Sequence, residues 1–437
     1  MNFLKSAISA VLSAFLVLSC AGGGAVYGEI DPAMEAAAFS QPFISPAQGG
    51  SKKPVYTNRE AVLFHLDQGM IGHYAGFWEE SSRDLETGER LIEDAFTKSL
   101  SQAIASYIVN DTVKDYPGED YEDLYINVFN SLNYYHRGDL EGALVEIRRL
   151  NEKLLYLSDK YETAKSKVLD SRSELSSTAY AREASSFSNS ALARYLGVLF
   201  YRGNGSADDA RIDMEELKAA YELAPEVYAN PLPSSLEDEL AISRGLGRLN
   251  VIAFTGLSPI KSEENIVIPL PYPAPNNFAR VALPKMIDRP SMVRAVEIVL
   301  DGGESFELEV IENMSAVARE TFKSRHSLVV LKSVARAIIK ATTSAGLAGA
   351  AEDRVEGLGA LIGLLGKVAS EATEKADTRT SWYFPACAFV GGINLEPGIY
   401  SVTINYYGAD GLIGTDRREN LLVRENNLNL TEFICLK

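Results

Sequence analysis

The stretch LYINVFNSLNYYHRGDLEGALVEIRRLNEKL, residues 124–154, decides the fold of the first half of the chain. Apolar residues recur on one helical face on each side of Gly138, which predicts two helices joined by a tight turn. Gly138 suits that turn because a residue without a Cβ atom accepts left-handed backbone geometry. Tyr134 lies one helical turn before this glycine, and Ala143 and Ile147 supply a small and a large packing position on the second helix. The stretch therefore predicts a helical hairpin.

Two weaker copies of this pattern flank the hairpin. The first contains Gly69, Gly76, Trp78, Ser81 and Leu85, and the second contains Gly197, Phe200, Ala210, Met214 and Leu217. A pattern that returns at similar spacing is typical of tetratricopeptide-like (TPR-like) helix pairs. The alternative is an ordinary α-helical domain, and residues 152–190 look like a long helical excursion between copies. We predict a TPR-like α-helical domain over residues 58–248.

The second half of the chain has a different pattern. Short β-type runs punctuated by Gly and Pro follow one another from residue 250 to residue 311. Near the end, Tyr400, Val402, Ile404 and Tyr406 alternate with polar residues, which predicts a strand with one apolar face. Two helical segments lie between these strand groups. We predict an α+β protein whose residues 249–437 form a β-rich, sandwich-like domain with a helical hairpin insert at about 315–373.

The first residues of the chain predict where in the cell the protein is located. Lys5 precedes an apolar block at residues 7–18, which is shorter than the roughly 20 residues that a membrane-spanning helix needs. The block ends at Cys20 in a pattern like the bacterial lipobox, so we predict a lipoprotein signal peptide at residues 1–19 and acylation of Cys20. The alternatives are a secretory signal cut elsewhere and an uncleaved anchor. Residues 20–57 are predicted to form a flexible tether. Outer-membrane delivery is favoured because Ala21 and Gly22, which directly follow Cys20, are not acidic.

The charge of the chain limits its partners. The net charge is −17, which excludes a surface built to hold nucleic-acid phosphates. Residues 59–248 carry 34 acidic and 20 basic side chains, whereas residues 249–437 carry 22 and 19. We expect the acidic helical half to dock a protein partner; alternatively, the charge only keeps the surface soluble. The candidate docking carboxylates are Glu119, Asp120, Glu122 and Asp123, which also suit the first turn of a helix without any catalytic role.

Motifs for catalysis and metal binding do not occur. The sequence has no His-Glu-x-x-His, Cys-x-x-Cys or Gly-x-Ser-x-Gly motif, and His65 and His73 are too far apart to bind one metal from adjacent helical turns. We therefore expect no enzyme, no cofactor and no metal. Beyond Cys20 the chain has only Cys387 and Cys435, which fit either a disulfide or two unpaired buried cysteines.

Two further groups of residues form a pattern known from other bacterial proteins. The first group is Asn110, Asp111, Tyr116, Gly118, Glu119, Asp120, Asn127, Gly138, Asp139, Leu140, Glu141, Gly142, Ala143, Arg148, Arg149 and Asn151. The second is Arg194, Tyr195, Leu196, Gly197, Tyr201, Asp377, Thr378, Arg379, Trp382 and Pro385. The pattern resembles a family of bacterial lipoproteins that have TPR-like regions and no assigned activity. The resemblance implies the lipobox and the architecture, and it implies no reaction.

Some of these residues are candidates for partner binding. They are Arg148, Arg149, Arg194, Tyr195, Asp377, Arg379 and Trp382. Residues 377–379 precede a predicted strand. Polar and aromatic side chains at this position form either the edge of a ligand-binding site or simply a turn that leads into the strand.

The sequence thus favours a non-enzymatic, lipid-anchored protein of the bacterial cell envelope that docks an envelope protein through its acidic helical half. The rival hypothesis is a periplasmic or surface lipoprotein that binds a ligand through its β-rich domain, and a hydrolase ranks third. A ligand binder should contain a deep apolar cavity with a few convergent polar groups, whereas a scaffold should not.

Overall fold

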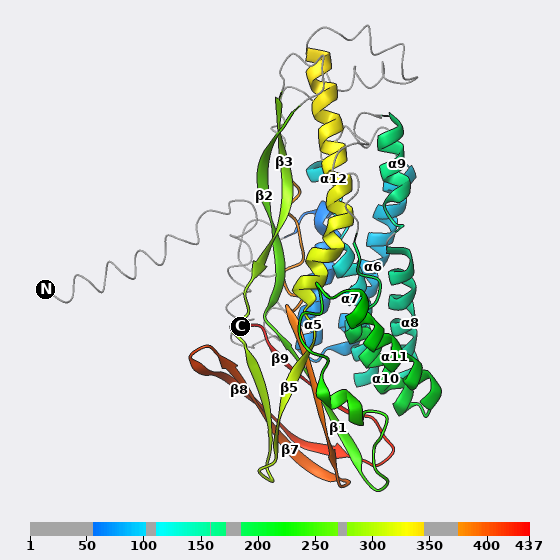
Figure 1. The fold of residues 1–437 in the computed structure, drawn as a ribbon, viewed down its shortest axis with the longest axis vertical. Coiled ribbons are helices and arrows are strands. Elements are labelled where there is room, and N and C mark those ends of the chain that lie inside the picture. The colour runs from blue at the N-terminus through cyan, green and yellow to red at the C-terminus, as the bar shows by residue number, and fades with distance from the viewer. Residues whose placement is uncertain (1–55, 102–110, 158, 172–184, 270–277, 345–374) are drawn as a thin grey trace, which may run out of the picture.

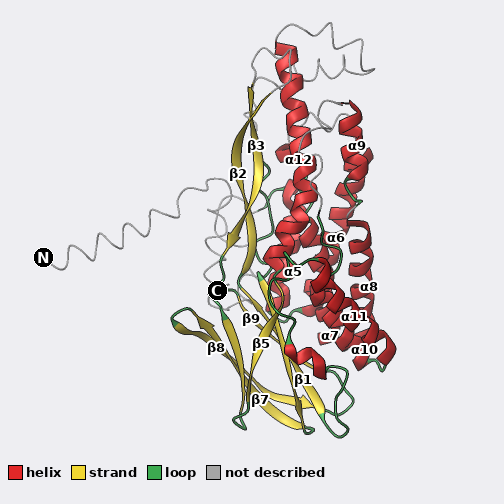
Figure 2. Ribbon diagram, viewed as in Figure 1, coloured by secondary structure: helices red, strands yellow, loops and turns green. Residues whose placement is uncertain are grey.

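In the computed structural model, the described residues are 56–101, 111–157, 159–171, 185–269, 278–344 and 375–437. Cys20, nearly all of the predicted tether and the second predicted helix of the insert lie outside them. Helices dominate the first half of the chain and strands the second, so the predicted α+β class is confirmed (Figures 1 and 2).

The first half consists mainly of α-helices. They are α5 (Ala61–Tyr74), α6 (Trp78–Ser101), α7 (Asp120–His136), α8 (Leu140–Leu157), α9 (Glu162–Ser171), α10 (Ala191–Gly203) and α11 (Ala207–Leu223), with short 3-10 helices η1 (Asn58–Glu60), η3 (Asp111–Val113) and η6 (Ser234–Asp238). Six of them form hairpins in which α5 packs on α6, α7 on α8 and α10 on α11. Gly76, Gly138 and Gly205 occupy the three turns with φ of +79°, +78° and +77°. The predicted hairpin and its two copies are therefore helical hairpins.

The turn glycine of the central hairpin provides a test of this geometry. Replacing Gly138 with Val should lower the free energy of unfolding by about 1–3 kcal/mol, because φ is +78° and a β-branched residue is strained there. No heavy atom lies within 4 Å of the Cβ position, so the loss reflects backbone strain alone. Urea unfolding measures the change, and Gly138→Asn serves as control, since Asn tolerates this conformation better. Equal stability of the Val variant and the wild type would contradict the turn.

The strands form one large sheet and one separate ribbon. The seven-stranded sheet has the order β8-β7-β4-β5-β6-β1-β9, and β2 and β3 pair only with each other. The strand bounds are β1 (Gly247–Thr255), β2 (Leu257–Pro269), β3 (Phe278–Arg289), β4 (Ala295–Leu300), β5 (Ser305–Glu312), β6 (Cys387–Leu395), β7 (Gly398–Gly408), β8 (Gly411–Val423) and β9 (Asn429–Cys435). In the large sheet only β1 and β9 run parallel.

The large sheet curls around a hydrophobic core of its own. Its end strands β8 and β9 contact each other, so the sheet is mostly closed. Val402, Ile404 and Tyr406 of β7 point into this core, as their alternation predicts. The seven strands form a single sheet, which corrects the expected sandwich of two stacked sheets.

The outer face of the sheet packs against the helical hairpins. Ile252 and Phe254 of β1 belong to the same buried cluster as the helix residues, and the ring of Phe129 on α7 lies 5.0 Å from that of Phe254. All nine residues of β1 are buried, because the helices cover one face and the curled sheet covers the other. The helical and β-rich halves are therefore joined by a hydrophobic core that is separate from the core inside the curled sheet.

The predicted insert begins with the long helix α12 (Met314–Ser344). This helix packs along the β2–β3 ribbon (Figure 1), where Val281 and Leu283 meet Leu328, Leu331 and Val334. We predicted that the insert packs on a sandwich-like sheet. This prediction is wrong, because α12 packs mainly on the β2–β3 ribbon.

Candidate functional site

The four candidate docking carboxylates lie at the start of α7. Glu119, Asp120 and Glu122 are 2%, 4% and 0% exposed, and the side chain of Asp123 is 16% exposed. The expectation that they present a docking surface is corrected, because carboxylates this deeply buried contact the rest of the chain instead.

Each buried carboxylate has partners from distant segments. Glu119 forms ion pairs with Lys261 of β2 and, at 3.3 Å, with Arg325 of α12. Burial alone would lower the pKa of Arg325, but Glu119 holds it above its ordinary value. Asp120 binds Lys160 at 2.7 Å and accepts a hydrogen bond of 2.9 Å from the hydroxyl of Tyr161. The start of α7 is therefore an internal junction between helices and the ribbon.

The buried carboxylates of Asp67 and Glu122 hold the segment before β6. Asp67 of α5 accepts hydrogen bonds from the Ser381 hydroxyl at 2.6 Å and the Trp382 amide at 2.9 Å. Glu122 accepts one from the Ser381 amide at 2.6 Å. Burial raises the pKa of Asp67 to about 6 and that of Glu122 to about 7, although the hydrogen bonds oppose this rise.

These raised pKa values make stability depend on pH. A carboxyl whose pKa is higher in the folded chain contributes stability below its unfolded pKa, and that contribution is lost as pH rises through the folded value. From pH 5 to pH 8 the free energy of unfolding should therefore fall, by about 1–3 kcal/mol for Glu122. The Glu122→Gln variant should lose less stability over this window than the wild type, measured by urea unfolding at both pH values. A variant with the exposed Glu237→Gln change should keep the wild-type slope, and an unchanged slope in Glu122→Gln would contradict the assignment.

The remaining candidate residues also make mostly internal contacts. Arg149 pairs with Glu146 at 2.9 Å and with Glu89, and Arg194 pairs with Asp213 at 2.7 Å. Tyr195 is fully buried and accepts a hydrogen bond from Asn250. Only Arg148 is exposed among these residues of the helical half.

Residues 377–382 form a packed connection rather than an open edge. Asp377 and Arg379 pair with each other at 2.8 Å, and the guanidinium of Arg379 lies over the ring of Tyr116. The guanidinium of Arg289 lies over the ring of Trp382, 5.4 Å from the ring centroid. These contacts explain why the sequence concentrates polar and aromatic residues here.

The two cysteines Cys387 and Cys435 are not bridged. Both pair in register with Thr255 of β1, one from β6 and the other from β9. Because adjacent strands lie about 4.8 Å apart, residues on the two flanking strands are about 10 Å apart, beyond the reach of a disulfide. Of the two alternatives, the structure supports free cysteines, and burial raises the pKa of Cys387 to about 12.

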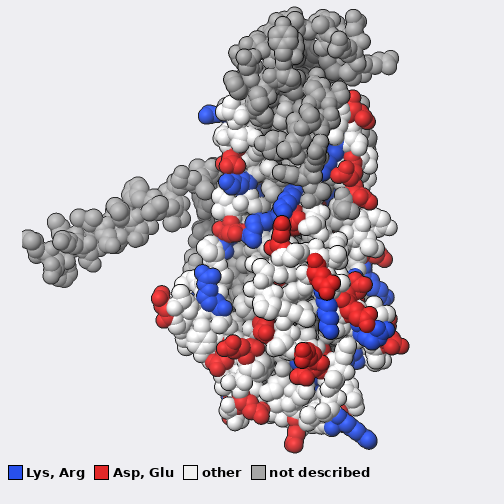
Figure 3. All heavy atoms as spheres, in the orientation of Figure 1, with Lys and Arg blue, Asp and Glu red and all other residues white. Residues whose placement is uncertain are grey.

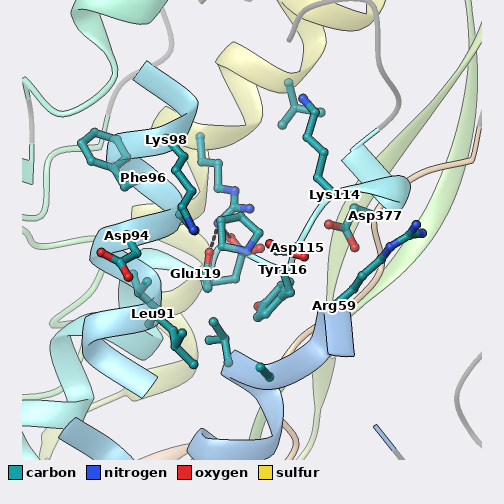
Figure 4. Close-up of a pocket in the computed structure, with 18 of the residues that line it drawn as sticks. Arg59, Leu91, Asp94, Phe96, Lys98, Lys114, Asp115, Tyr116, Glu119 and Asp377 are labelled. Atoms are coloured by element: carbon teal, nitrogen blue, oxygen red, sulfur yellow. Dashed lines mark hydrogen bonds and ion pairs between the residues drawn. The ribbon is translucent and has the colours of Figure 1, made fainter. Parts of the chain in front are cut away.

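A cavity of about 500 Å³ lies beside the start of α7, where Glu119 is part of its lining. Its walls come from α6, α12, the start of α9, η1 with the start of α5, and the segment at residues 113–119. Figure 4 shows Lys98 extending from α6 toward Glu119, while Arg59 and Asp377 lie on the other side of Tyr116. The volume is within the range of about 300–1,000 Å³ that is usual for small-molecule sites.

The apolar part of the cavity wall comes from facing helices. Leu91, Ile92 and Ala95 of α6 share a lining with Leu328 and Val329 of α12. Phe96 and Tyr161 meet edge to face at one side, with centroids 6.4 Å apart. The cavity therefore combines an apolar wall with charged groups.

The sequence did not reveal this cavity. The residues that line it come from segments more than 200 positions apart, and none of those segments carries a local binding motif. Of the acidic candidates Glu119, Asp120, Glu122 and Asp123, only Glu119 belongs to the lining.

The face of the described residues that Figure 3 shows has no continuous acidic patch. In the view of Figure 3, acidic and basic side chains are interspersed over the helical side. Within the described ranges, no helix is long and apolar enough to span a membrane, and no group of His, Cys, Asp or Glu residues could hold a metal ion. No protein-family model, no curated protein and no solved structure matches the chain.

Proposed function

We propose that this chain is a non-enzymatic, lipid-anchored protein of the bacterial cell envelope that holds a small ligand in the cavity between α6, α9 and α12. The observation that carries the proposal is the cavity itself, since its volume of about 500 Å³ and its mixed lining suit a small molecule. The proposed site lies among helices of both halves of the chain, whereas the sequence analysis placed the ligand site of the rival hypothesis in the β-rich domain.

Acylated Cys20 would attach the protein to a lipid bilayer, with the outer membrane favoured. The lipobox-like sequence before Cys20 and the resemblance to TPR-like lipoproteins support this part of the proposal. Three helical hairpins with glycine turns are compatible with a TPR-like arrangement.

Native mass spectrometry of the gently purified full chain tests the proposal. Wild-type protein should carry a bound small molecule, and Ala95→Trp should lose it, because the indole fills the cavity at the α6 wall. The matched control is Ala219→Trp, which changes a half-buried alanine of α11 away from the lining and should retain the ligand. Wild-type protein free of any small molecule would contradict the proposal.

One observation favours the second candidate, a scaffold that docks an envelope protein. Leu155 and Tyr156 at the end of α8 are 73% and 72% exposed. A photocrosslinking amino acid at position 156, used in intact cells, should trap that protein if α8 is the docking surface. The same experiment at exposed Lys218 of α11 serves as control and should trap no protein.

A further inference from the structure

The exposed charged residues of the cavity lining balance one another. They are Arg59, Asp94, Lys98 and Asp115. Two of these residues are basic and two are acidic, so together they carry no net charge. Water and salt also screen an exposed charge. These four residues therefore favour neither an anionic nor a cationic ligand.

The less exposed charged residues of the lining are paired within the chain. Glu119 pairs with Lys261 and, at 3.3 Å, with Arg325. Lys160 pairs with Asp120 at 2.7 Å. In each pair the partners neutralise each other, and so neither is available as the counter-charge of a ligand.

The same holds for the other three less exposed charged residues of the lining. Asp377 pairs with Arg379 at 2.8 Å, and Lys114 and Lys332 have partners within the chain. A charged group that leaves water needs a new counter-charge or hydrogen-bond partners, since its burial is otherwise costly. A charged ligand would have to break one of these internal pairs, which an uncharged ligand would leave intact.

The buried hydroxyl groups of the lining also donate within the chain. Tyr116 donates a hydrogen bond of 2.8 Å to Glu122, and Tyr161 donates one of 2.9 Å to Asp120. An uncharged but strongly polar molecule such as a sugar needs several hydrogen-bond partners to replace the water that it loses. These two donors are already used, so the lining suits such a molecule poorly.

The apolar residues of the lining keep surface that a ligand can cover. Leu91 and Ala95 of α6 and Val329 of α12 all line the cavity and are only half-buried. Removing apolar surface from water is favourable in proportion to the area removed. These side chains therefore supply the interaction that the paired charges do not.

We infer that the cavity takes an uncharged, largely apolar molecule that packs against Leu91 and Ala95 of α6 and Val329 of α12. The internal pairing of the charged residues and the uncovered apolar wall together carry this inference. It rests on the proposed function and specifies the ligand of that site.

Isothermal titration calorimetry with three naphthalene derivatives tests the inference. 1-Naphthalenemethanol is uncharged at neutral pH, whereas 1-naphthoate is an anion and 1-naphthylmethylammonium is a cation on the same ring system. The mature chain with Cys20→Ser is stripped of bound molecules on hydrophobic resin and titrated without detergent. The alcohol should bind, and each charged probe should bind more weakly by about tenfold or more. Failure of the alcohol to bind, or a charged probe that binds as tightly as the alcohol, would overturn the inference.

A pair of tryptophan variants tests where the probe binds. Ala95→Trp should weaken binding of the alcohol by about tenfold or more, because the indole takes up the space beside the α6 wall. Ala219→Trp, on α11 away from the lining, should leave it unchanged. Equal affinities of the two variants would overturn the placement of the ligand. If the alcohol fails to bind while wild-type protein carries another molecule that Ala95→Trp loses, the ligand class is wrong and the proposed function stands.

Discussion

Replacing Glu239 with Ala is expected to lower the free energy of unfolding by about 3–5 kcal/mol. This carboxylate is fully buried and forms ion pairs with Arg202 of α10 and, at 2.8 Å, with Arg248 of β1. Arg248 is itself only 1% exposed, so the variant leaves a buried guanidinium without its main counter-charge. Removing one partner of a buried ion pair costs far more than the pair contributes. Denaturant unfolding of the full chain measures the loss.

Glu237→Ala is the matched control for this prediction. Glu237 lies in η6, two residues before Glu239, and is exposed, so its removal should change stability by less than about 0.5 kcal/mol. A loss of under 1 kcal/mol for Glu239→Ala would contradict the view that this ion-pair cluster joins the helices to the sheet.

The second large effect is expected at the predicted anchor. Cys20→Ser should move nearly all of the protein from the membrane fraction to the soluble fraction, because the acyl chains would be missing and each buried methylene contributes about 0.8 kcal/mol. Fractionation after a high-salt wash, together with labelling by a palmitate analogue, measures the effect. Cys435→Ser should leave both readouts unchanged, since this cysteine lies at the end of β9. Full retention of the Cys20→Ser variant on membranes would exclude acylation as the attachment.

Local patterns predicted the parts of the fold that local physics determines. The glycine at 138 marks a turn because positive φ is accessible without a Cβ atom, and the alternation at residues 400–406 marks a strand because one of its faces is buried. Both predictions are confirmed. Nothing in the sequence showed that β9 adds in parallel beside β1, since this pairing joins residues about 180 positions apart.

The prediction that the acidic residues at the start of α7 form a docking surface was wrong for one physical reason. Glu119, Asp120 and Glu122 look like an exposed acidic run, but their partners Lys261, Lys160 and Ser381 lie far away in the sequence. A single sequence reveals charges and not their neighbours, so a buried network and a docking patch look alike.

Photocrosslinking in intact cells tests most directly whether the cavity holds a small ligand. A photocrosslinking amino acid at position 329, on the α12 wall of the cavity, should add the mass of a small molecule to the peptide that contains it, and Ala95→Trp should abolish this added mass while Ala219→Trp preserves it. The absence of added mass on this peptide, or equal added mass in the two tryptophan variants, would contradict a ligand site in the cavity.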